Sequence, residues 1–267
     1  MTRWVCGLSY DGTDYCGWQR QPAVSTPKPA VQNVVEAALA RIAGHPVTIR
    51  CAGRTDAGVH ALQQVIQFDT LADRPASAWI RGVNACLPAT VAFRWAVTSD
   101  AAFDARFSAT ARTYWYALVD APVCPPLWRD RAGWSHRALD ADRMREAAAC
   151  LRGRHDFSSF RASQCQAASP VRTIESLEVT REGRFVLLSL TANAFLHHMV
   201  RNLVGSLVYV ADGRRPVDWI AEVLAARIRS SAAPTFSACG LYLASVRYDA
   251  HWQLPVADPP PRLCELV

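Results

Sequence analysis

The residues best suited to chemistry lie in one short segment, residues 51–60, with the sequence CAGRTDAGVH. Gly53 and Gly58 bracket Arg54 and Asp56, and glycine lets a backbone turn tightly or approach a ligand closely. A carboxylate held in such a loop can act as a nucleophile, a general base or a metal ligand. An ordinary hairpin loop with an Arg–Asp ion pair would use the same residues, so the loop by itself leaves both interpretations open.

Arg201 is the second chemical candidate, because it lies in a predicted helix that is apolar on most sides. A guanidinium in such surroundings needs an anion, since an unpaired buried charge is costly. Any carboxylate could serve in a structural ion pair, and the sharper hypothesis is that Asp56 is the partner and is kept ionised by it. On the same helix, His197 and His198 would diverge by about 100°, so we expect ordinary core or surface side chains and no metal site.

A predicted strand at residues 110–119 carries a possible base-stacking surface. The period of two places Arg112, Tyr114 and Tyr116 on one face. A basic residue beside aromatic rings on a sheet is typical of proteins that stack on RNA bases. Packing of both tyrosines under a helix would produce the same pattern.

The composition indicates a folded protein with a basic surface. The chain has 267 residues, is 51% hydrophobic and carries a net charge of +6, and Lys28 is its one lysine. Arginine suits phosphates and bases, although an arginine-rich, lysine-poor chain is also typical of a GC-rich genome. The N-terminus does not resemble a signal peptide, and no apolar run reaches the roughly 18 residues of a membrane span. We expect a cytoplasmic protein with reduced cysteines.

The element pattern predicts an α+β fold of two tandem ferredoxin-like halves, each with the order β-α-β-β-α-β. We expect an N-terminal half at residues 1–105 that carries the Asp56 loop, a C-terminal half with an extra helix at 106–250, and a proline-rich tail at 251–267. The predicted strands are 4–10, 47–52, 60–68, 91–98, 110–119, 174–180, 184–190 and 241–246. The predicted helices are 31–42, 75–86, 140–151, 197–211 and 216–228, the last with Val217, Ile220, Leu224 and Ile228 buried.

An ordered series of motifs gives these residues a family context. The segment from Gly53 to His60, GRTDAGVH, resembles the catalytic motif of the bacterial tRNA pseudouridine synthase A family. The resemblance extends to about Asp249 through further stretches in the same order: YDGT at 10–13, GWQRQ at 17–21, FDARFSATAR at 103–112, YWY at 114–116, DFSSF at 156–160, FLHHMVRN at 195–202 and GLYL at 240–243. Thr113, Trp115 and Cys239 depart from the residues common in that family.

The resemblance implies a fold, an activity and a set of roles. The fold would be the pseudouridine synthase fold, with a central mixed sheet. The protein would be a homodimer that binds the tRNA anticodon arm and isomerises uridines at positions 38, 39 and/or 40 to pseudouridine, without metal or cofactor. Its implied site consists of catalytic Asp56, stacking Tyr114, Arg201 paired with Asp56, Arg54 that helps displace the base, Leu241 lining the pocket, and Arg20 and Arg112 contacting the substrate.

Two other functions are compatible with parts of the sequence. A non-catalytic RNA-binding or tRNA-chaperone protein could use tandem sheets of this kind, but it would have little use for a paired Asp56 and Arg201. A small-molecule hydrolase would need a base beside its nucleophile, and the sequence offers none next to Asp56 or a cysteine.

Overall fold

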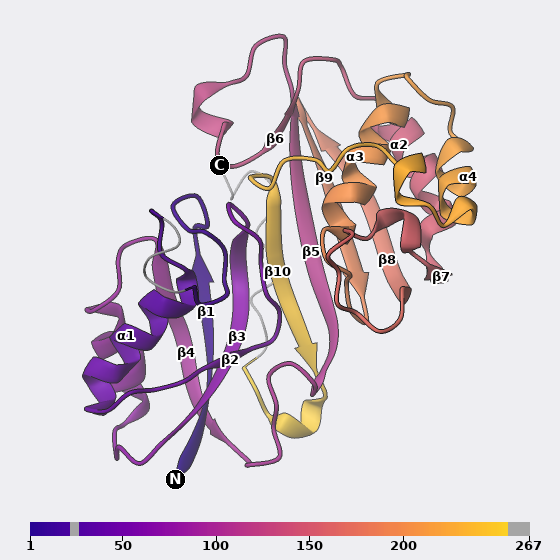
Figure 1. Ribbon diagram of the computed structural model, residues 1–267. Coiled ribbons are helices and arrows are strands. Elements are labelled where there is room, and N and C mark those ends of the chain that lie inside the picture. The colour runs from indigo at the N-terminus through magenta and orange to yellow at the C-terminus, as the bar shows by residue number, and fades with distance from the viewer. Residues whose placement is uncertain (22–26, 256–267) are drawn as a thin grey trace. The chain divides into compact units, whose positions relative to one another are not determined.

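The computed structural model describes residues 1–21 and 27–255, and the chain folds as two compact units (Figure 1). The first unit contains residues 1–110 together with the segment that begins at Tyr242, and the second contains residues 111–241. The expected boundary at residue 105 assigned the last strand to the second half, whereas that strand lies in the first unit. Most of the expected tail, residues 256–267, lies outside the described residues.

The first unit follows the predicted β-α-β-β-α-β order, and its second helical segment is a π-helix. Its elements are β1 (Thr2–Tyr10), α1 (Val31–Ala43), β2 (Arg50–Cys51), β3 (His60–Thr70), the π-helix Ala78–Gly82, β4 (Val91–Ser99) and β10 (Leu241–Tyr248), which begins one residue before the unit boundary. Helix α1 ends at Gly44, whose φ of 75° is the left-handed conformation that glycine adopts readily. The predicted strand 47–52 is reduced to the two residues of β2.

The sheet of the first unit is mixed. Its strands have the order β4-β1-β3-β10, and β2 pairs with β3 at the end away from β10. All pairs are antiparallel except β3 and β10, which run parallel, with Tyr242 opposite His60. This pairing places β10 next to the strand that leaves the Asp56 loop.

Aromatic side chains pack the helical layer of the first unit onto its sheet. Trp79 of the π-helix is fully buried, and its ring lies 5.8 Å from that of Trp4 on β1 and 5.1 Å from that of Phe68 on β3. Burying such large rings contributes several kcal/mol, roughly 25 cal/mol for each Å² of apolar surface removed from water.

The second unit contains the predicted β-α-β-β-α series, with two additional short strands and a further helix. Its elements are β5 (Ala109–Asp120), whose first two residues belong to the first unit, β6 (Gly133–Ser135), α2 (Ala141–Ala148), β7 (Gly153–Asp156), β8 (Val171–Glu182), β9 (Phe185–Ala192), α3 (Met199–Ala211) and α4 (Trp219–Ala226). Asp140 caps α2, since its carboxylate accepts hydrogen bonds from the main-chain N–H groups of Asp142 and Arg143. Strands β6 and β7 were not predicted.

The sheet of the second unit is also mixed, with the order β5-β9-β8-β7 and β6 parallel to β5. Figure 1 shows α2, α3 and α4 gathered beside β8 and β9. Of the residues predicted to be buried on the last helix (α4), Val217 and Leu224 are half-buried and Ile228 is 56% exposed. The helix ends at Ala226 because Arg227 adopts a left-handed conformation with φ of 55°, so the chain leaves the helical register before Ile228. Ile220 is buried as predicted.

Candidate active site

The loop that carries Asp56 joins β2 to β3 and is fastened at its start by a buried glutamine. Gly53 donates its main-chain N–H to Gln64 Oε1 at 3.3 Å, and Gln64 Nε2 donates to the Gly53 carbonyl at 2.6 Å. Gln64 lies on β3 and is fully buried. Because a buried amide is costly to leave unsatisfied, these two hydrogen bonds hold the loop entrance against β3.

The end of β1 and the segment that follows it hold the centre of the loop in place. The hydroxyls of Tyr10 and Thr55 hydrogen-bond at 2.8 Å in a buried position, and Trp18 donates its main-chain N–H to the Thr55 carbonyl at 2.9 Å. Gly17 has φ of 108°, and a Cβ there would lie 3.0 Å from the Thr55 carbonyl oxygen. The residue immediately before Asp56 is therefore fixed by both its side chain and its main chain.

A cluster of polar side chains holds the far end of the loop. The Asp11 carboxylate lies 3.0 Å from Nδ1 of His60, and the His60 ring stacks on Tyr242 with centroids 4.7 Å apart. The hydrogen bond with His60 holds the pKa of Asp11 well below its usual range, and hydrogen bonds from Thr13 lower it further. Gly12 packs so tightly that a Cβ would lie 2.0 Å from the Val59 carbonyl oxygen.

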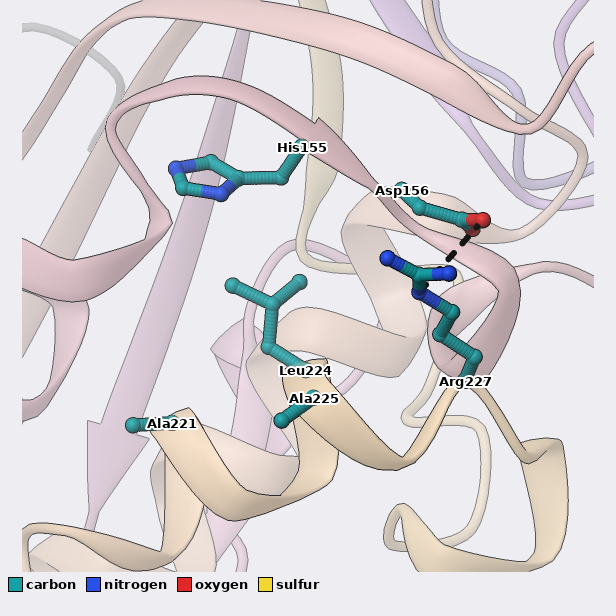
Figure 2. A pocket seen from close by; sticks show the side chains of 6 residues that line it. All are labelled: His155, Asp156, Ala221, Leu224, Ala225 and Arg227. Atoms are coloured by element: carbon teal, nitrogen blue, oxygen red, sulfur yellow. Dashed lines mark ion pairs between the residues drawn. The ribbon is translucent and has the colours of Figure 1, made fainter.

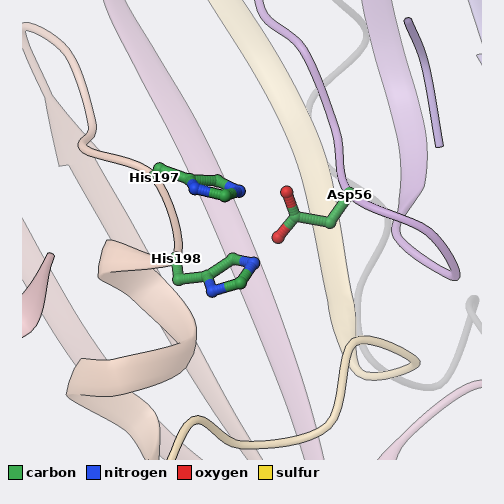
Figure 3. Close-up of side chains that lie close together, drawn as sticks. All are labelled: Asp56, His197 and His198. Carbon is green, nitrogen blue, oxygen red and sulfur yellow. The ribbon is translucent and has the colours of Figure 1, made fainter. Parts of the chain in front are cut away.

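Between these three sets of contacts, Asp56 is half-buried, and Arg54 and Ala57 beside it are exposed. The Asp56 carbonyl accepts a hydrogen bond from Val59 N at 3.1 Å, which closes a turn at Gly58, whose φ is 75°. The Asp56 side chain projects from the loop (Figure 3). The sequence-based prediction of a tight glycine-bracketed loop that presents a carboxylate agrees with this geometry.

In the second unit, Tyr114 lies on β5 and is 9% exposed. Its ring meets Phe195 edge-on, with centroids 4.9 Å apart, while Arg112 Nη1 donates to the Asn193 carbonyl at 3.2 Å. Tyr116, predicted on the same face, has no exposed surface, and its hydroxyl donates to the Ser237 carbonyl at 2.7 Å. The position of Tyr116 on this face is therefore explained by packing and not by base stacking.

Arg201 lies in the first turns of α3 and is half-buried. Its Nε donates to the Phe236 carbonyl at 2.9 Å, and Phe236 N donates back to the Arg201 carbonyl at 3.2 Å. The neighbouring Asn202 is fully buried, donates to the Phe160 carbonyl at 2.8 Å and accepts from the Thr235 hydroxyl at 2.6 Å. These contacts tie the segment before β10 to α3.

The two histidines before α3 differ from the expectation. They precede the helix, because His198 adopts a left-handed conformation with φ of 60° and the helix begins at Met199. Their rings therefore lie side by side, with centroids 4.0 Å apart, as Figure 3 shows. The expected 100° divergence was wrong because it assumed a helical backbone.

Leu241 and Arg20 complete the predicted residues. Leu241 begins β10, is 6% exposed and follows Gly240, where a Cβ would lie 2.4 Å from the Ala117 carbonyl oxygen. That close approach leaves room for glycine alone and sets the position of Leu241. In the first unit, Arg20 forms an ion pair with the buried Glu36 of α1, and this contact anchors the segment after Trp18.

A separate hollow of about 230 Å³ lies on the second unit, between β7 and α4 (Figure 2). An ion pair between Asp156 and Arg227, at 3.7 Å, lies on its wall. The hollow is lined by His155, Asp156, Ala221, Leu224, Ala225 and Arg227. The hollow includes none of the predicted site residues.

Sequence reasoning did not assign roles to the braces of the Asp56 loop. Asp11 and His60 belong to recognised motifs, yet only the fold brings them together, and Gln64 lies in a strand where polar side chains are ordinarily exposed. One feature of the sequence could have indicated the role of Gln64: two consecutive glutamines, Gln63 and Gln64, lie inside an apolar strand. A polar residue that is buried in a sheet needs a hydrogen-bond partner.

Comparison with known proteins agrees with these motifs. Residues 8–108 and 147–249 match the family described as tRNA pseudouridine synthase, and the first stretch includes the Asp56 loop and its braces. The chain belongs to the tRNA pseudouridine synthase family. The predicted family, the pseudouridine synthase fold and the assignment as an isomerase are thereby confirmed.

Individual relatives are similar over nearly their whole length. The chain is 52% identical over 260 residues to tRNA pseudouridine synthase A of Bordetella petrii, covering 97% of this chain and 96% of that protein. It is 54% identical over 256 residues to the protein of the same name from Burkholderia lata, covering 96% and 93%. A crystal structure of a Cbf5-Nop10-Gar1 complex is a weaker match, with 12% identity and a TM-score of 0.36 over 92% of this chain and 58% of that chain. The family assignment therefore rests on the sequence matches.

Within residues 1–21 and 27–255, no helix combines the length and the apolar character needed to cross a bilayer.

Proposed function

We propose that this protein converts uridine to pseudouridine at positions 38, 39 and/or 40 of the tRNA anticodon arm. The observation that carries the proposal is Asp56, a half-buried carboxylate on a loop braced from three sides, within a segment that matches the family. The reaction breaks the C1′–N1 bond and joins C1′ to C5, while a proton leaves C5 and N1 gains one. Because reactant and product have the same atomic composition, the reaction needs no oxidant, reductant or phosphoryl donor.

The roles of the surrounding residues follow from their types and positions. Asp56 acts on the uridine, and the exposed Arg54 takes the place of the base as it leaves its stack. Removing a base from its stack costs a few kcal/mol, and stacking on Tyr114 returns about 1–3 kcal/mol of that. Arg201 is the proposed ion-pair partner of Asp56.

The remaining predicted residues shape the binding of the tRNA. Leu241 lines the pocket, where an apolar wall excludes water from the reacting base. Arg112 and Arg20 contact the sugar–phosphate backbone, to which arginine binds through paired N–H groups. We propose that the isomerisation needs neither metal nor cofactor, because a carboxylate can serve both its bond-breaking and its bond-forming half.

We further propose a homodimer that acts in the cytoplasm and docks the anticodon arm across both copies. Apolar side chains exposed on the second unit support a protein interface: Val123 is 77% exposed, Leu127 84% and Trp134 39%. Sedimentation analysis of the wild type and of Leu127→Asp tests this part, and a wild-type protein that sediments as a monomer at micromolar concentration would contradict it.

The test of the activity is to incubate purified protein with unmodified tRNA in buffer containing EDTA and to map pseudouridine by chemical modification and primer extension. We expect pseudouridine at one or more of positions 38–40. A protein that binds the tRNA but leaves every uridine unchanged would instead be the non-catalytic RNA-binding protein.

A further inference from the structure

Phe107 lies on the turn between β4 and β5 and is 78% exposed. A single exposed apolar side chain is common on protein surfaces. Whether such a side chain has a role depends on how firmly its backbone is held and on which charges surround it.

The turn that presents Phe107 is held by the Asp104 side chain. One carboxylate oxygen, Oδ1, accepts hydrogen bonds from Arg106 N at 2.8 Å and from Phe107 N at 2.9 Å. Ser108 closes the turn, because its N–H donates to the Asp104 carbonyl at 2.9 Å and its Oγ accepts from Asp104 N at 3.0 Å. The ring is thus presented on a preorganised backbone, which lowers the entropy cost of binding.

The same turn is attached beside the Asp56 loop. Arg50 Nη1 donates to Asp104 Oδ2 at 3.1 Å, and Ala105 N donates to the side chain of Gln67. Gln67 is the partner of Arg50 in the β2–β3 pair, and β2 runs directly into the Asp56 loop. Phe107 is therefore a neighbour of the catalytic loop within the first unit.

The surroundings of the ring are positively charged. The Arg106 guanidinium carbon lies 5.3 Å from the centre of the Phe107 ring, within cation–π range. Arg54 is close by: burial raises the pKa of the Cys51 thiol to about 12, and the charges of Arg54 and Arg106 both oppose that shift. Asp104 is an acid in this cluster, and Arg50 and two main-chain N–H groups already occupy its carboxylate.

We propose that Phe107 stacks on an unpaired base of the RNA substrate while Arg106 pairs with an adjacent phosphate. An exposed ring among cations suits a nucleotide, since every base has a flat face and each linkage carries a negative charge. This position is additional to the one where the reacting uracil is bound. The inference deepens the proposed function and rests on it for the identity of the RNA.

The test measures the Kd for unmodified tRNA, together with kcat and KM, for Phe107→Ala, Phe107→Leu, Phe107→Tyr and Phe107→Trp. Because alanine substitution removes one base–aromatic stack, we expect Phe107→Ala to raise Kd and KM about tenfold and to leave kcat unchanged at saturating tRNA. Phe107→Leu should bind tRNA nearly as weakly as Phe107→Ala. The Kd of the two aromatic variants should stay within about twofold of the wild-type value.

The matched control is Leu71→Ala, which removes an apolar side chain that is 79% exposed in the same unit. It should leave Kd unchanged, and thermal unfolding should show that all the variants fold alike. Wild-type affinity in Phe107→Ala would overturn the inference, and wild-type affinity in Phe107→Leu would overturn stacking in favour of a general apolar contact.

The binding measurement separates this inference from the proposed function. If the protein forms pseudouridine but Phe107→Ala binds tRNA normally, the role of Phe107 is wrong and the function stands. If Phe107→Ala weakens tRNA binding by a protein that forms no pseudouridine, the stacking role stands and the proposed function is wrong.

Discussion

The Asp11 carboxylate lies 3.0 Å from Nδ1 of the buried His60, although the two residues belong to different segments of the chain. Asp11 follows β1, whereas His60 begins β3 directly after the Asp56 loop. The contact joins the two segments at the end of the loop. The position of Asp56 therefore depends on a contact between two side chains that take no part in the proposed reaction.

Replacing Asp11 with Asn should slow catalysis without weakening tRNA binding. The amide keeps the size of the side chain but removes the charge that faces His60, at a cost in stability of about 1–2 kcal/mol. We expect kcat to fall several-fold with KM nearly unchanged, measured as initial rates of pseudouridine formation. Asp14→Asn is the control, since Asp14 is 77% exposed and pairs only at 3.7 Å with Lys28. A rise in KM alone would contradict a positioning role.

The same pair predicts how stability depends on pH. Folding lowers the pKa of Asp11, so its contribution is present above the unfolded value of about 3.9 and is lost as the pH falls toward the lower folded value. Denaturant unfolding of the wild type and of Asp11→Asn should differ at pH 6, and the difference should shrink below about pH 4. A gap that stayed constant down to pH 3 would show that the charge of Asp11 does not stabilise the fold.

Asp56→Asn should abolish pseudouridine formation while leaving tRNA affinity within about threefold of the wild type. The amide has nearly the shape of the carboxylate but cannot act as a nucleophile or base, and such groups contribute roughly 10²–10⁴-fold or more to rate. Pseudouridine mapping and filter binding measure the two properties separately. Activity retained by this variant would refute the assigned role.

The proposed pairing of Asp56 with Arg201 can be tested with a double-mutant cycle. Arg201→Met should reduce kcat by roughly 10–100-fold, the value of a lost charge-assisted hydrogen bond. If the two residues act as a pair, adding it to the weak residual activity of Asp56→Glu should cost much less than the two separate losses predict. Fully additive losses in kcat would mean that Arg201 does not act through Asp56.

Tyr114→Phe separates stacking from proton transfer. The ring and its edge-on contact with Phe195 remain, so tRNA affinity should not change, whereas a proton-transfer role would be lost and kcat would fall. Tyr116→Phe is the matched control, because it removes a buried hydrogen bond to the Ser237 carbonyl and should lower stability by about 1 kcal/mol without affecting kcat. Unchanged turnover in Tyr114→Phe would restrict Tyr114 to stacking.

Local signals predicted most of the secondary structure correctly. Gly44 ends α1, Asp140 caps α2, and the hairpin around Gly183 joins β8 to β9. Each of these depends on residues that are close along the chain, so the residue types suffice. The tight, glycine-bracketed loop around Asp56 was predictable for the same reason.

The sequence by itself determined which side chains are available for chemistry, the order of most of the elements and the family to which their motifs belong. Tertiary structure alone decided which contacts hold these side chains in place. They are the hydrogen bonds of Gln64 with Gly53 and of Tyr10 with Thr55, the contact of Asp11 with His60, and the packing that buries Tyr116. Tertiary structure also decided that β10 runs parallel to β3 and that His198 leaves the helix. The physical reason is that these contacts join residues far apart along the chain, and periodicity and propensity describe only neighbours.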